Sequence, residues 1–289
     1  MKFESPVFIV GAGRSGSTVF HEMFCDHPQI AWMSTLCDEY PADPARNRAL
    51  MRAIDVPLVG SLLKRKFHPS ECYTYWNRLY PGFARPCRDL VAADVTVPVK
   101  DSVSRALASL VTRKRHRLLT KSTGWPRVGF LAEIFPDAKF IHMYRDGRAV
   151  ANSLMQVDFW SGWRGPWDWR RGVLSPALQQ EWERHDRSFV ALAAIEWKIV
   201  MEAMDAAKNS VAADNFYELR YEDFAVDPVG TFRRVVSFCG IDWSDRFERA
   251  LRTYSISTAN GKWRKDLTAA QQVVLQDVLA AALTRYGYA

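Results

Sequence analysis

The octapeptide GAGRSGST at residues 11–18 directly follows the apolar run VFIV at residues 7–10, and an apolar-periodic stretch comes after it. This order indicates a strand, a glycine-rich turn and the start of a helix. Such a turn points several backbone N–H groups and the positive end of a helix dipole at one place. The sequence therefore predicts a binding site for a phosphate or sulfate group at this turn.

The turn departs at one position from the form that binds nucleoside triphosphates. In that form, G-x-x-x-x-G-K-[ST], a lysine follows the last glycine and reaches the β- and γ-phosphates. Here Ser17 occupies that position, and the only cation of the turn is Arg14. A planar guanidinium recognises tetrahedral oxyanions through paired hydrogen bonds. We therefore expect a P-loop-like phosphate cradle without the lysine of nucleoside triphosphate enzymes.

Length and composition set outer limits on the fold. The chain has 289 residues, of which 48% are hydrophobic, enough for a buried core. We expect a single domain over residues 1–289, with insertions at about 40–100 and 156–176. The formal net charge of +7 favours an anionic ligand or surface, and ordinary solubility charge explains it equally well.

Cysteine use and the N-terminus bear on the cellular compartment. The 5 cysteines include no C-x-x-C pair and no histidine at the spacing of a zinc site, which favours free thiols in a reducing compartment. The first ten residues lack the basic region of a signal peptide, and no segment approaches the roughly 18 apolar residues of a membrane span. We expect a cytoplasmic protein without a membrane span or a metal site.

Strand-like runs recur along the chain, and a helical pattern follows each of them. They cover residues 7–10, 30–33, 117–120, 139–144 and 216–220. Strands that alternate with helices predict an α/β fold, a parallel sheet with helices on both faces. Apolar spacings of three, four and seven predict one long amphipathic helix near residues 177–207. Residues 40–100 show neither a strand nor a repeat.

Helix caps can be read at two later positions. Asp227 and Pro228 have the types of an N-cap and a first helical residue, in a helix that stops at Gly240. Thr268 and Gln271 form a capping box at the start of the last helix. The chain is therefore expected to end in a packed helix.

A second strong signal is AKFIHMYRDGRAVANS at residues 138–153. It predicts a strand that ends at Arg145 and a helix that carries Ser153 about two turns later. Open α/β sheets bind ligands at the carboxyl ends of their strands. Arg145 and Ser153 could therefore hold a second phosphate, although a surface arginine and a helix serine bonded to its own backbone would give the same pattern.

Five segments of the sequence, in this order along the chain, together resemble a known protein family. They are VFIVGAGRSGST (7–18), LLTKS (118–122), IFPDAKFIHMYRDGRAVANS (134–153), FYELRYEDFAVDPVGTFRRVVSFCGI (216–241) and NGKWRKDL (260–267). Together they resemble the sulfotransferases that use 3′-phosphoadenosine 5′-phosphosulfate (PAPS), most closely bacterial enzymes and the tyrosylprotein branch. The resemblance implies the sulfotransferase fold, a P-loop-type parallel sheet flanked by helices. It also implies transfer of the sulfuryl group of PAPS to a hydroxyl, with adenosine 3′,5′-bisphosphate as product and no metal.

The resemblance assigns the donor site residue by residue. The residues that match the loop around the 5′-phosphosulfate are Arg14, Ser15, Gly16, Ser17 and Thr18. Arg145 and Ser153 match the pair that binds the 3′-phosphate, the group that distinguishes PAPS from ATP. Lys121 is similar to the lysine that assists the leaving group in the tyrosylprotein branch.

The resemblance also implies four further residues of the donor site, in motifs that are less specific. Tyr221 is placed like a residue near the adenine in related enzymes, and core packing would explain it as well. Lys262, Trp263 and Arg264 match a C-terminal loop that closes over the nucleotide, where the alternative is a solvated turn before the last helix.

The general base departs from the family pattern. In the tyrosylprotein branch it is a glutamate shortly after the second strand, and that position falls near Thr35 here. The nearest carboxylates are Asp38 and Glu39, and Glu39 is the first choice. Glu71 and His68, in the unmatched insertion, are the next candidates.

The acceptor site is the least determined part. Trp160, Trp163, Trp167 and Trp169 cluster in a Gly/Pro-punctuated loop and either line a pocket for a small-molecule, lipid or sugar acceptor or form a packed lid. Glu71 is included in this expected acceptor site. Two other functions are compatible with parts of the sequence: an ATP-dependent small-molecule kinase, disfavoured by the missing lysine, and a non-catalytic module for nucleic acid or another polyanion. The latter would not explain basic residues at strand-to-helix turns, so no nucleic acid partner is expected.

Overall fold

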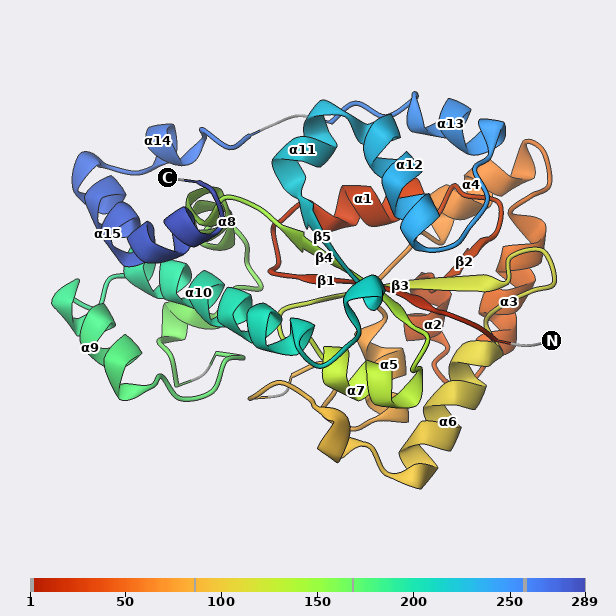
Figure 1. The fold of residues 1–289 in the computed structure, drawn as a ribbon, viewed down its shortest axis with the longest axis horizontal. Helices are drawn as coiled ribbons and strands as arrows, with labels where there is room; N and C mark the ends of the chain where they lie inside the picture. The colour runs from red at the N-terminus through yellow and green to blue at the C-terminus, as the bar shows by residue number, and fades with distance from the viewer. Residues whose placement is uncertain (1–2, 86, 168, 257–258, 289) are drawn as a thin grey trace.

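A computed structural model describes residues 3–85, 87–167, 169–256 and 259–288 of the chain. In these residues a parallel sheet has the strand order β2-β3-β1-β4-β5 (Figure 1). The strands are β1 (Val7–Gly11), β2 (Ile30–Trp32), β3 (Arg117–Thr123), β4 (Lys139–Tyr144) and β5 (Phe216–Arg220). The predicted fold class, a parallel sheet flanked by helices, is confirmed.

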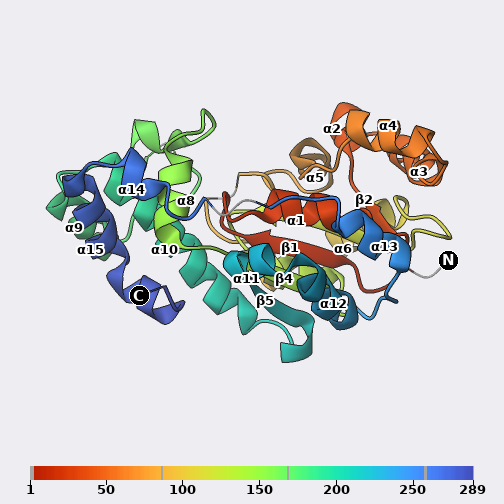
Figure 2. The same cartoon turned by 90° about the horizontal axis from the view of Figure 1, so that it is seen from above.

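Helices surround this sheet. They are α1 (Ser17–Phe24), α2 (Thr35–Glu39), α3 (Pro44–Ala53), α4 (Val59–Lys66), α5 (Tyr73–Leu79), α6 (Val97–Ala108), α7 (Val128–Ile134), α8 (Gly147–Leu154), α9 (Pro176–Arg184), α10 (Phe189–Lys208), α11 (Tyr221–Val226), α12 (Pro228–Phe238), α13 (Asp245–Leu251), α14 (Trp263–Asp266) and α15 (Ala269–Arg285), with short 3-10 turns at η1 (Ala92–Asp94), η2 (Ser161–Arg164) and η3 (Ala213–Asn215). Helices α1 and α12 lie on one face of the sheet and α6 and α7 on the other (Figure 1). Helices α8, α10 and α15 pack together beyond the end of the sheet at which β1 finishes (Figures 1 and 2).

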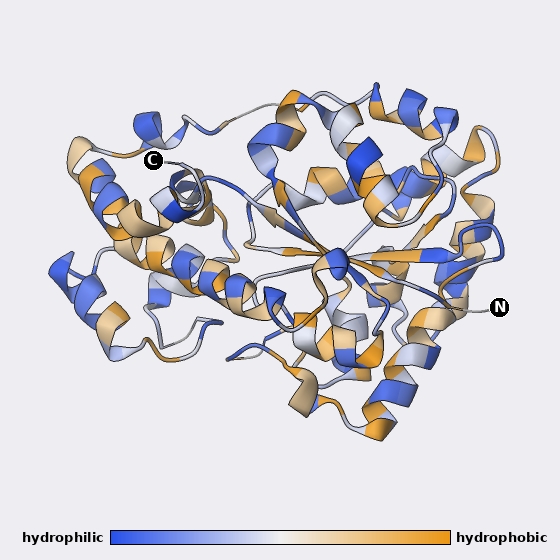
Figure 3. Ribbon diagram, in the orientation of Figure 1, coloured by the Kyte–Doolittle hydropathy of each residue, from blue (hydrophilic) through white to orange (hydrophobic). Residues whose placement is uncertain are grey.

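The sheet forms the centre of the hydrophobic core. Every residue of β1 is buried, and so are residues 140–143 of β4, as expected for strands covered on both faces. The strands are coloured mainly as hydrophobic in Figure 3. Phe20 of α1 stacks on Phe232 of α12 with 4.7 Å between ring centroids, which joins the two helices over the sheet. Burying an aromatic side chain of this kind contributes about 1.5–3 kcal/mol.

The helix predicted at residues 177–207 is in fact two helices, α9 and α10. Asp186 and Arg187 between them have φ of 53° and 54°, in the left-handed region that ends a helix. Ser188 then caps α10 by accepting a hydrogen bond from the N–H of Ala191. Apolar periodicity continues across the break because both helices face the same core, so it could not reveal the break.

Two other predicted helix starts are confirmed, and one strand is longer than predicted. Asp227 caps α12 at the N–H of Gly230, and Thr268 and Gln271 form the predicted capping box. Strand β3 runs to Thr123, three residues beyond the predicted end at residue 120. The polar triplet at residues 121–123 continues the strand and pairs with β1, where Lys121 lies opposite Ile9.

Candidate active site

The turn between β1 and α1 packs directly on two other elements. Gly11 and Gly16 have φ of 148° and 83°, which favour glycine. A Cβ on Gly16 would lie 2.3 Å from the ring of Tyr221, and one on Gly11 would lie 2.2 Å from the carbonyl oxygen of Met143. Glycine is therefore required at both positions, because the turn contacts β4 and α11.

Ser15 lies inside this turn with an unused hydroxyl. Its side chain is buried, and its Oγ has no hydrogen-bond partner among the described residues. A buried polar atom without a partner costs about 1–3 kcal/mol, so its presence indicates a group bound from outside the chain. The free N–H groups at the start of α1 face the same turn. Ser17 is buried at this helix start, whereas Arg14 and Thr18 are exposed. These features fit an oxyanion in the turn.

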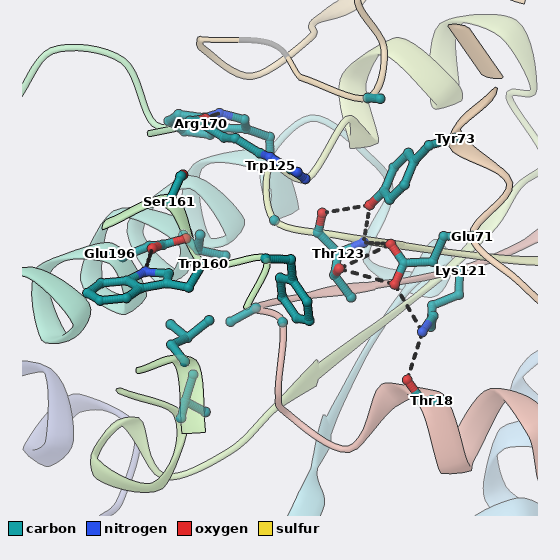
Figure 4. Close-up of a pocket in the computed structure, with 18 of the residues that line it drawn as sticks. Thr18, Glu71, Tyr73, Lys121, Thr123, Trp125, Trp160, Ser161, Arg170 and Glu196 are labelled. Carbon is teal, nitrogen blue, oxygen red and sulfur yellow. Dashed lines mark hydrogen bonds and ion pairs between the residues drawn. The ribbon is translucent and has the colours of Figure 1, made fainter. Parts of the chain in front are cut away.

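Lys121 reaches this turn from the neighbouring strand β3. Its Nζ donates a hydrogen bond to Oγ1 of Thr18 at 2.9 Å and lies 3.0 Å from Oε1 of Glu71 (Figure 4). Its side chain is 8% exposed, so the ammonium depends on these two partners. Lys121 thus brings an ammonium group to the turn from β3, although the turn itself has Ser17 at the position of the loop lysine.

Glu71 comes from the segment just before α5 and points at the end of β3. Its carboxylate accepts hydrogen bonds from the N–H and the hydroxyl of Thr123. Burial acts to raise the pKa of Glu71, but the charge of Lys121 and the hydrogen bonds from Tyr73, Lys121 and Thr123 outweigh it, and the pKa lies below its ordinary value. Glu71 is therefore an ionised carboxylate at neutral pH.

Three of the expected donor residues lie together on the other side of the turn. Arg14 donates from Nε to Oγ of Ser153 at 2.9 Å. Arg145, directly after β4, donates from Nη1 to the carbonyl oxygen of Arg14 at 3.4 Å. Asp146 caps α8 at the N–H of Arg148, which fixes the helix that carries Ser153. A strand end and a helix two turns long thus converge on the turn.

Arg145 is held in place by two further contacts. Its guanidinium lies 4.5 Å from the centroid of the Tyr221 ring, and its Nε donates to Oδ1 of Asn260 at 2.7 Å. The ring of Tyr221 is buried, between Arg145 and the backbone of Gly16. Tyr221 therefore packs against the turn as well as against an expected phosphate ligand.

The C-terminal segment with Lys262, Trp263 and Arg264 packs beside α8. Trp263 is buried, and the guanidinium groups of Arg148 and Arg264 lie 5.3 and 4.4 Å from its ring centroid. Lys262 donates from Nζ to the side chain of Gln156 at 2.9 Å. The segment is thus anchored by a buried tryptophan, while Lys262 and Arg264 are exposed.

A cavity of about 490 Å³ adjoins the turn. Its walls are formed by α1, the segment around Glu71, the end of β3, helix α8, helix α10 and the loop before α9. The turn, Lys121 and Glu71 lie at one end, and Trp160 lies at the other (Figure 4). The rest of the wall combines apolar side chains, among them Val150, Leu154 and Trp197, with the charged side chains of Glu22, Arg127, Arg170, Arg171 and Glu196. This arrangement fits an apolar ligand whose reacting group meets Glu71 and Lys121.

Of the tryptophans expected in an acceptor site, Trp160 lines this cavity. It is buried, and its Nε1 donates to the carboxylate of Glu196 at 2.7 Å. Trp163 packs edge-on against Trp160 at 4.7 Å and borders a separate groove. Trp167 is 73% exposed, and Trp169 is buried with its N–H bonded to Gly172. Two of the four tryptophans of the loop are thus buried and two are exposed, and Trp160 lines the cavity.

The three candidates for the general base occupy different places. Glu39 ends α2 with an exposed side chain and is not part of the cavity wall, whereas His68 and Glu71 are. Helix α2 turns Glu39 away because its buried face carries Cys37 instead. The structure therefore does not place Glu39 at the site, and Glu71 replaces it as the first candidate.

Five charged residues of the wall were not singled out from the sequence: Glu22, Arg127, Arg170, Arg171 and Glu196. Glu22 follows Thr18 by four residues in α1, so the helical period was a signal that could have found it. Glu196 lies in a largely apolar helix and pairs with Arg171 at 2.7 Å. That pairing depends on the path of the loop, which the local sequence does not determine.

The described ranges contain neither a metal-binding cluster nor a membrane-spanning helix. No group of three or more His, Cys, Asp or Glu side chains there could hold a metal ion. None of the helices in the same ranges combines the length and apolar character that crossing a bilayer demands.

The sequence matches a known protein family. Residues 6–245 match the model of the "Sulfotransferase family". An omega-hydroxy-beta-dihydromenaquinone-9 sulfotransferase of Mycobacterium tuberculosis is 24% identical over 315 residues, which cover 99% of this chain and 76% of that protein. A protein-tyrosine sulfotransferase of Caenorhabditis elegans is 25% identical over 248 residues, covering 83% of this chain and 51% of that protein.

Solved structures share the fold. A sulfotransferase from Mycobacterium avium superposes with a TM-score of 0.59 at 17% identity, over 99% of this chain and 77% of that one. The sulfotransferase domain of the Synechococcus olefin synthase gives a TM-score of 0.50 at 19% identity, over 97% and 96%. At these identities the likeness concerns the fold.

Proposed function

Because the chain belongs to the sulfotransferase family, we propose that it transfers the sulfuryl group of PAPS to a hydroxyl of an acceptor bound in the cavity. One observation carries the proposal: the phosphate-type turn, Lys121 and Glu71 meet at one end of a cavity whose wall also includes the apolar side chains of Val150, Leu154 and Trp197. A donor group in the turn and a hydroxyl in the cavity would face each other there.

The residues of the turn fit the 5′-phosphosulfate end of the donor. The turn offers the unpaired Oγ of Ser15, the N–H groups at the start of α1 and the guanidinium of Arg14, whose Nε also donates to Ser153. Arg145 and Ser153, which both contact Arg14, are proposed to hold the 3′-phosphate. Lys262, Trp263 and Arg264 remain proposed to cover the nucleotide, from their position beside α8.

The chemistry follows from the charges that surround this point. Sulfuryl transfer is an in-line displacement at sulfur, akin to phosphoryl transfer with its loose transition state, so catalysis consists mainly of positioning and of cations that offset developing charge. Arg14 and the turn N–H groups supply that charge on the donor side. Lys121, fixed by Thr18 and Glu71, is placed to donate a proton or hydrogen bond to the leaving oxygen. The Glu71 carboxylate would accept the proton of the acceptor hydroxyl.

The acceptor is proposed to be a small molecule, lipid or sugar with an apolar body. The wall residues Val150, Leu154, Trp160 and Trp197 support this, because they offer aliphatic and aromatic surface. The mycobacterial relative is named for omega-hydroxy-beta-dihydromenaquinone-9, and the nematode relative is named for protein tyrosine. The cysteines, four buried and none in a disulfide within the described structure, favour the cytoplasm as the compartment.

Calorimetric titration with adenosine 3′,5′-bisphosphate, AMP and ATP tests the proposed donor. The bisphosphate should bind most tightly, and Arg145→Met should remove most of its advantage over AMP. Loss of one charged hydrogen-bonded contact costs about 1.5–3 kcal/mol, or roughly tenfold to a hundredfold in affinity. Equal affinity of the wild-type protein for AMP and the bisphosphate would contradict the assignment.

A further inference from the structure

We infer that Arg170 binds an oxyanion, such as a carboxylate or phosphate, on the part of the acceptor remote from its reacting hydroxyl. The inference rests on the proposed function for the statement that the ligand of the cavity is the acceptor. It narrows the acceptor class from apolar hydroxyl compounds to anionic amphiphiles.

The charges of the cavity wall are almost all matched within the protein. Lys121 pairs with Glu71 at 3.0 Å, and Arg171 pairs with Glu196 at 2.7 Å. Arg127 is buried and donates to backbone carbonyl oxygens and to Ser122. Each of these cations therefore has an acceptor within the protein.

Arg170 is the exception among the cations. Its guanidinium makes no hydrogen bond or ion pair with any residue that the structure describes, although it lies in the cavity wall. Burial lowers the pKa of Arg170, and the positive charge of Arg85 lowers it further. A guanidinium keeps its proton under these conditions, so the group is a fixed charge that lacks its full complement of acceptors. An oxyanion would satisfy it through paired hydrogen bonds.

Arg170 lies away from the proposed reaction centre, so its guanidinium would bind the acceptor and not take part in the transfer. In Figure 4, Arg170 and Trp125 lie across the cavity from Thr18 and away from Lys121. Trp125 fixes the backbone here, since its Nε1 donates to the carbonyl oxygen of Arg170 at 2.9 Å. The second unmatched charge of the described wall, Glu22, lies one helical turn from Thr18 at the donor end. An acceptor with its hydroxyl at Glu71 would therefore present its other end to Arg170.

A matched pair of probes tests this inference without turnover. The probes are ω-(4-hydroxyphenyl)alkanoates with two to six chain carbons and their carboxamides, which differ in charge but hardly in size. Binding is followed by calorimetry in the presence of adenosine 3′,5′-bisphosphate. We expect the wild type to bind at least one acid more tightly than its amide. Arg170→Gln should weaken that acid by about tenfold to a hundredfold and leave the amide unchanged.

The control is Arg113→Gln, which removes the same charge at an exposed position outside the cavity wall. It should bind both probes like the wild type. The inference is overturned if no acid binds more tightly than its amide, or if Arg170→Gln weakens acid and amide alike. Should Arg170→Gln fail to fold, Arg170→Lys keeps the charge but loses the paired geometry, and it should retain only part of the preference for the acid.

A second titration separates this inference from the proposed function. Arg170→Gln should bind adenosine 3′,5′-bisphosphate with wild-type affinity when no acceptor probe is present. If that affinity falls together with the affinity for the acid, Arg170 belongs to the donor site and the inference fails. If the wild type does not bind the bisphosphate at all, the proposed function fails, while the acid and amide titrations, repeated without it, still decide the role of Arg170.

Discussion

Lys121 and Glu71 form an ion pair at 3.0 Å between strand β3 and a segment that the sequence places fifty residues earlier. Their side chains are 8% and 19% exposed, so each charge is stabilised mainly by the other. Removing one partner of such a pair leaves an uncompensated charge in a poorly solvated place, which is more costly than loss of the attraction itself. Substitutions at this pair should therefore keep size and hydrogen-bonding capacity.

Glu71→Gln should lower turnover by roughly 10²- to 10⁴-fold, the range typical for loss of a general base. The affinity for adenosine 3′,5′-bisphosphate should stay within a few-fold of wild type, because Gln still bonds to Thr123 and Lys121. Steady-state kinetics and calorimetry on the same preparation check this. Glu39→Gln is the matched control, since Glu39 is exposed on α2, and it should turn over normally. A strong defect in Glu39→Gln with normal Glu71→Gln would return the base to Glu39.

The pH dependence follows from the depressed pKa of Glu71. The reactive form is the carboxylate, so kcat/KM should rise with pH through this lowered pKa, below the ordinary value of about 4.3, and show no inflection from Glu71 between roughly pH 5 and 8. The same group stabilises the fold above its unfolded pKa and loses that contribution as pH falls through the folded pKa. In Glu71→Gln the acid limb of the stability profile should flatten. An inflection near pH 6 that disappears in Glu71→Gln would show that the pKa is raised instead.

Gly16→Ala should reduce both stability and donor binding. The new Cβ would lie 2.3 Å from the Tyr221 ring, at a residue with φ of 83°. Left-handed backbone costs about 1–2 kcal/mol and overpacking about 1–3 kcal/mol more. Gly82→Ala separates the two effects, because Gly82 has φ of 87° and no atom within 4 Å of its Cβ position. Thermal unfolding should show the larger loss for Gly16→Ala, and equal losses would mean that the Tyr221 contact is unimportant.

Trp160→Ala should raise the KM for the acceptor and spare donor affinity, the result expected when ground-state binding is removed. Trp160 lines the cavity and bonds to Glu196, whereas Trp167 is largely exposed away from it. Trp167→Ala should therefore leave both constants unchanged. A Trp167→Ala variant with a raised acceptor KM would show that the acceptor extends over the loop.

Turnover should persist in EDTA. Arg14, Lys121 and backbone N–H groups are proposed to supply the positive charge at the sulfuryl group. If EDTA abolished activity and Mg²⁺ restored it, the metal-free mechanism would be wrong and phosphoryl transfer would have to be reconsidered.

The strands and the turn were predictable because their determinants are local. Apolar runs define the strands of the sheet, and Gly11 and Gly16 mark a turn that few other residues can make. The break between α9 and α10 was missed, since apolar periodicity passes through Asp186 and Arg187, whose left-handed backbone leaves no mark in that pattern. Residues 40–100 showed neither a strand nor a repeat, and helices α3, α4 and α5 lie in this range, with Glu71 between α4 and α5.

By itself, the sequence determined the sheet, the oxyanion-type turn and the resemblance to sulfotransferases, because these depend on short segments whose residues interact with their neighbours in the chain. Only the tertiary structure decided which carboxylate meets Lys121, which tryptophan reaches the cavity and which arginine is left unmatched. Glu71, Trp160 and Arg170 lie on irregular segments, and their neighbours in space come from strands and helices tens of residues away. Long-range packing sets such contacts, and no local period or spacing encodes them.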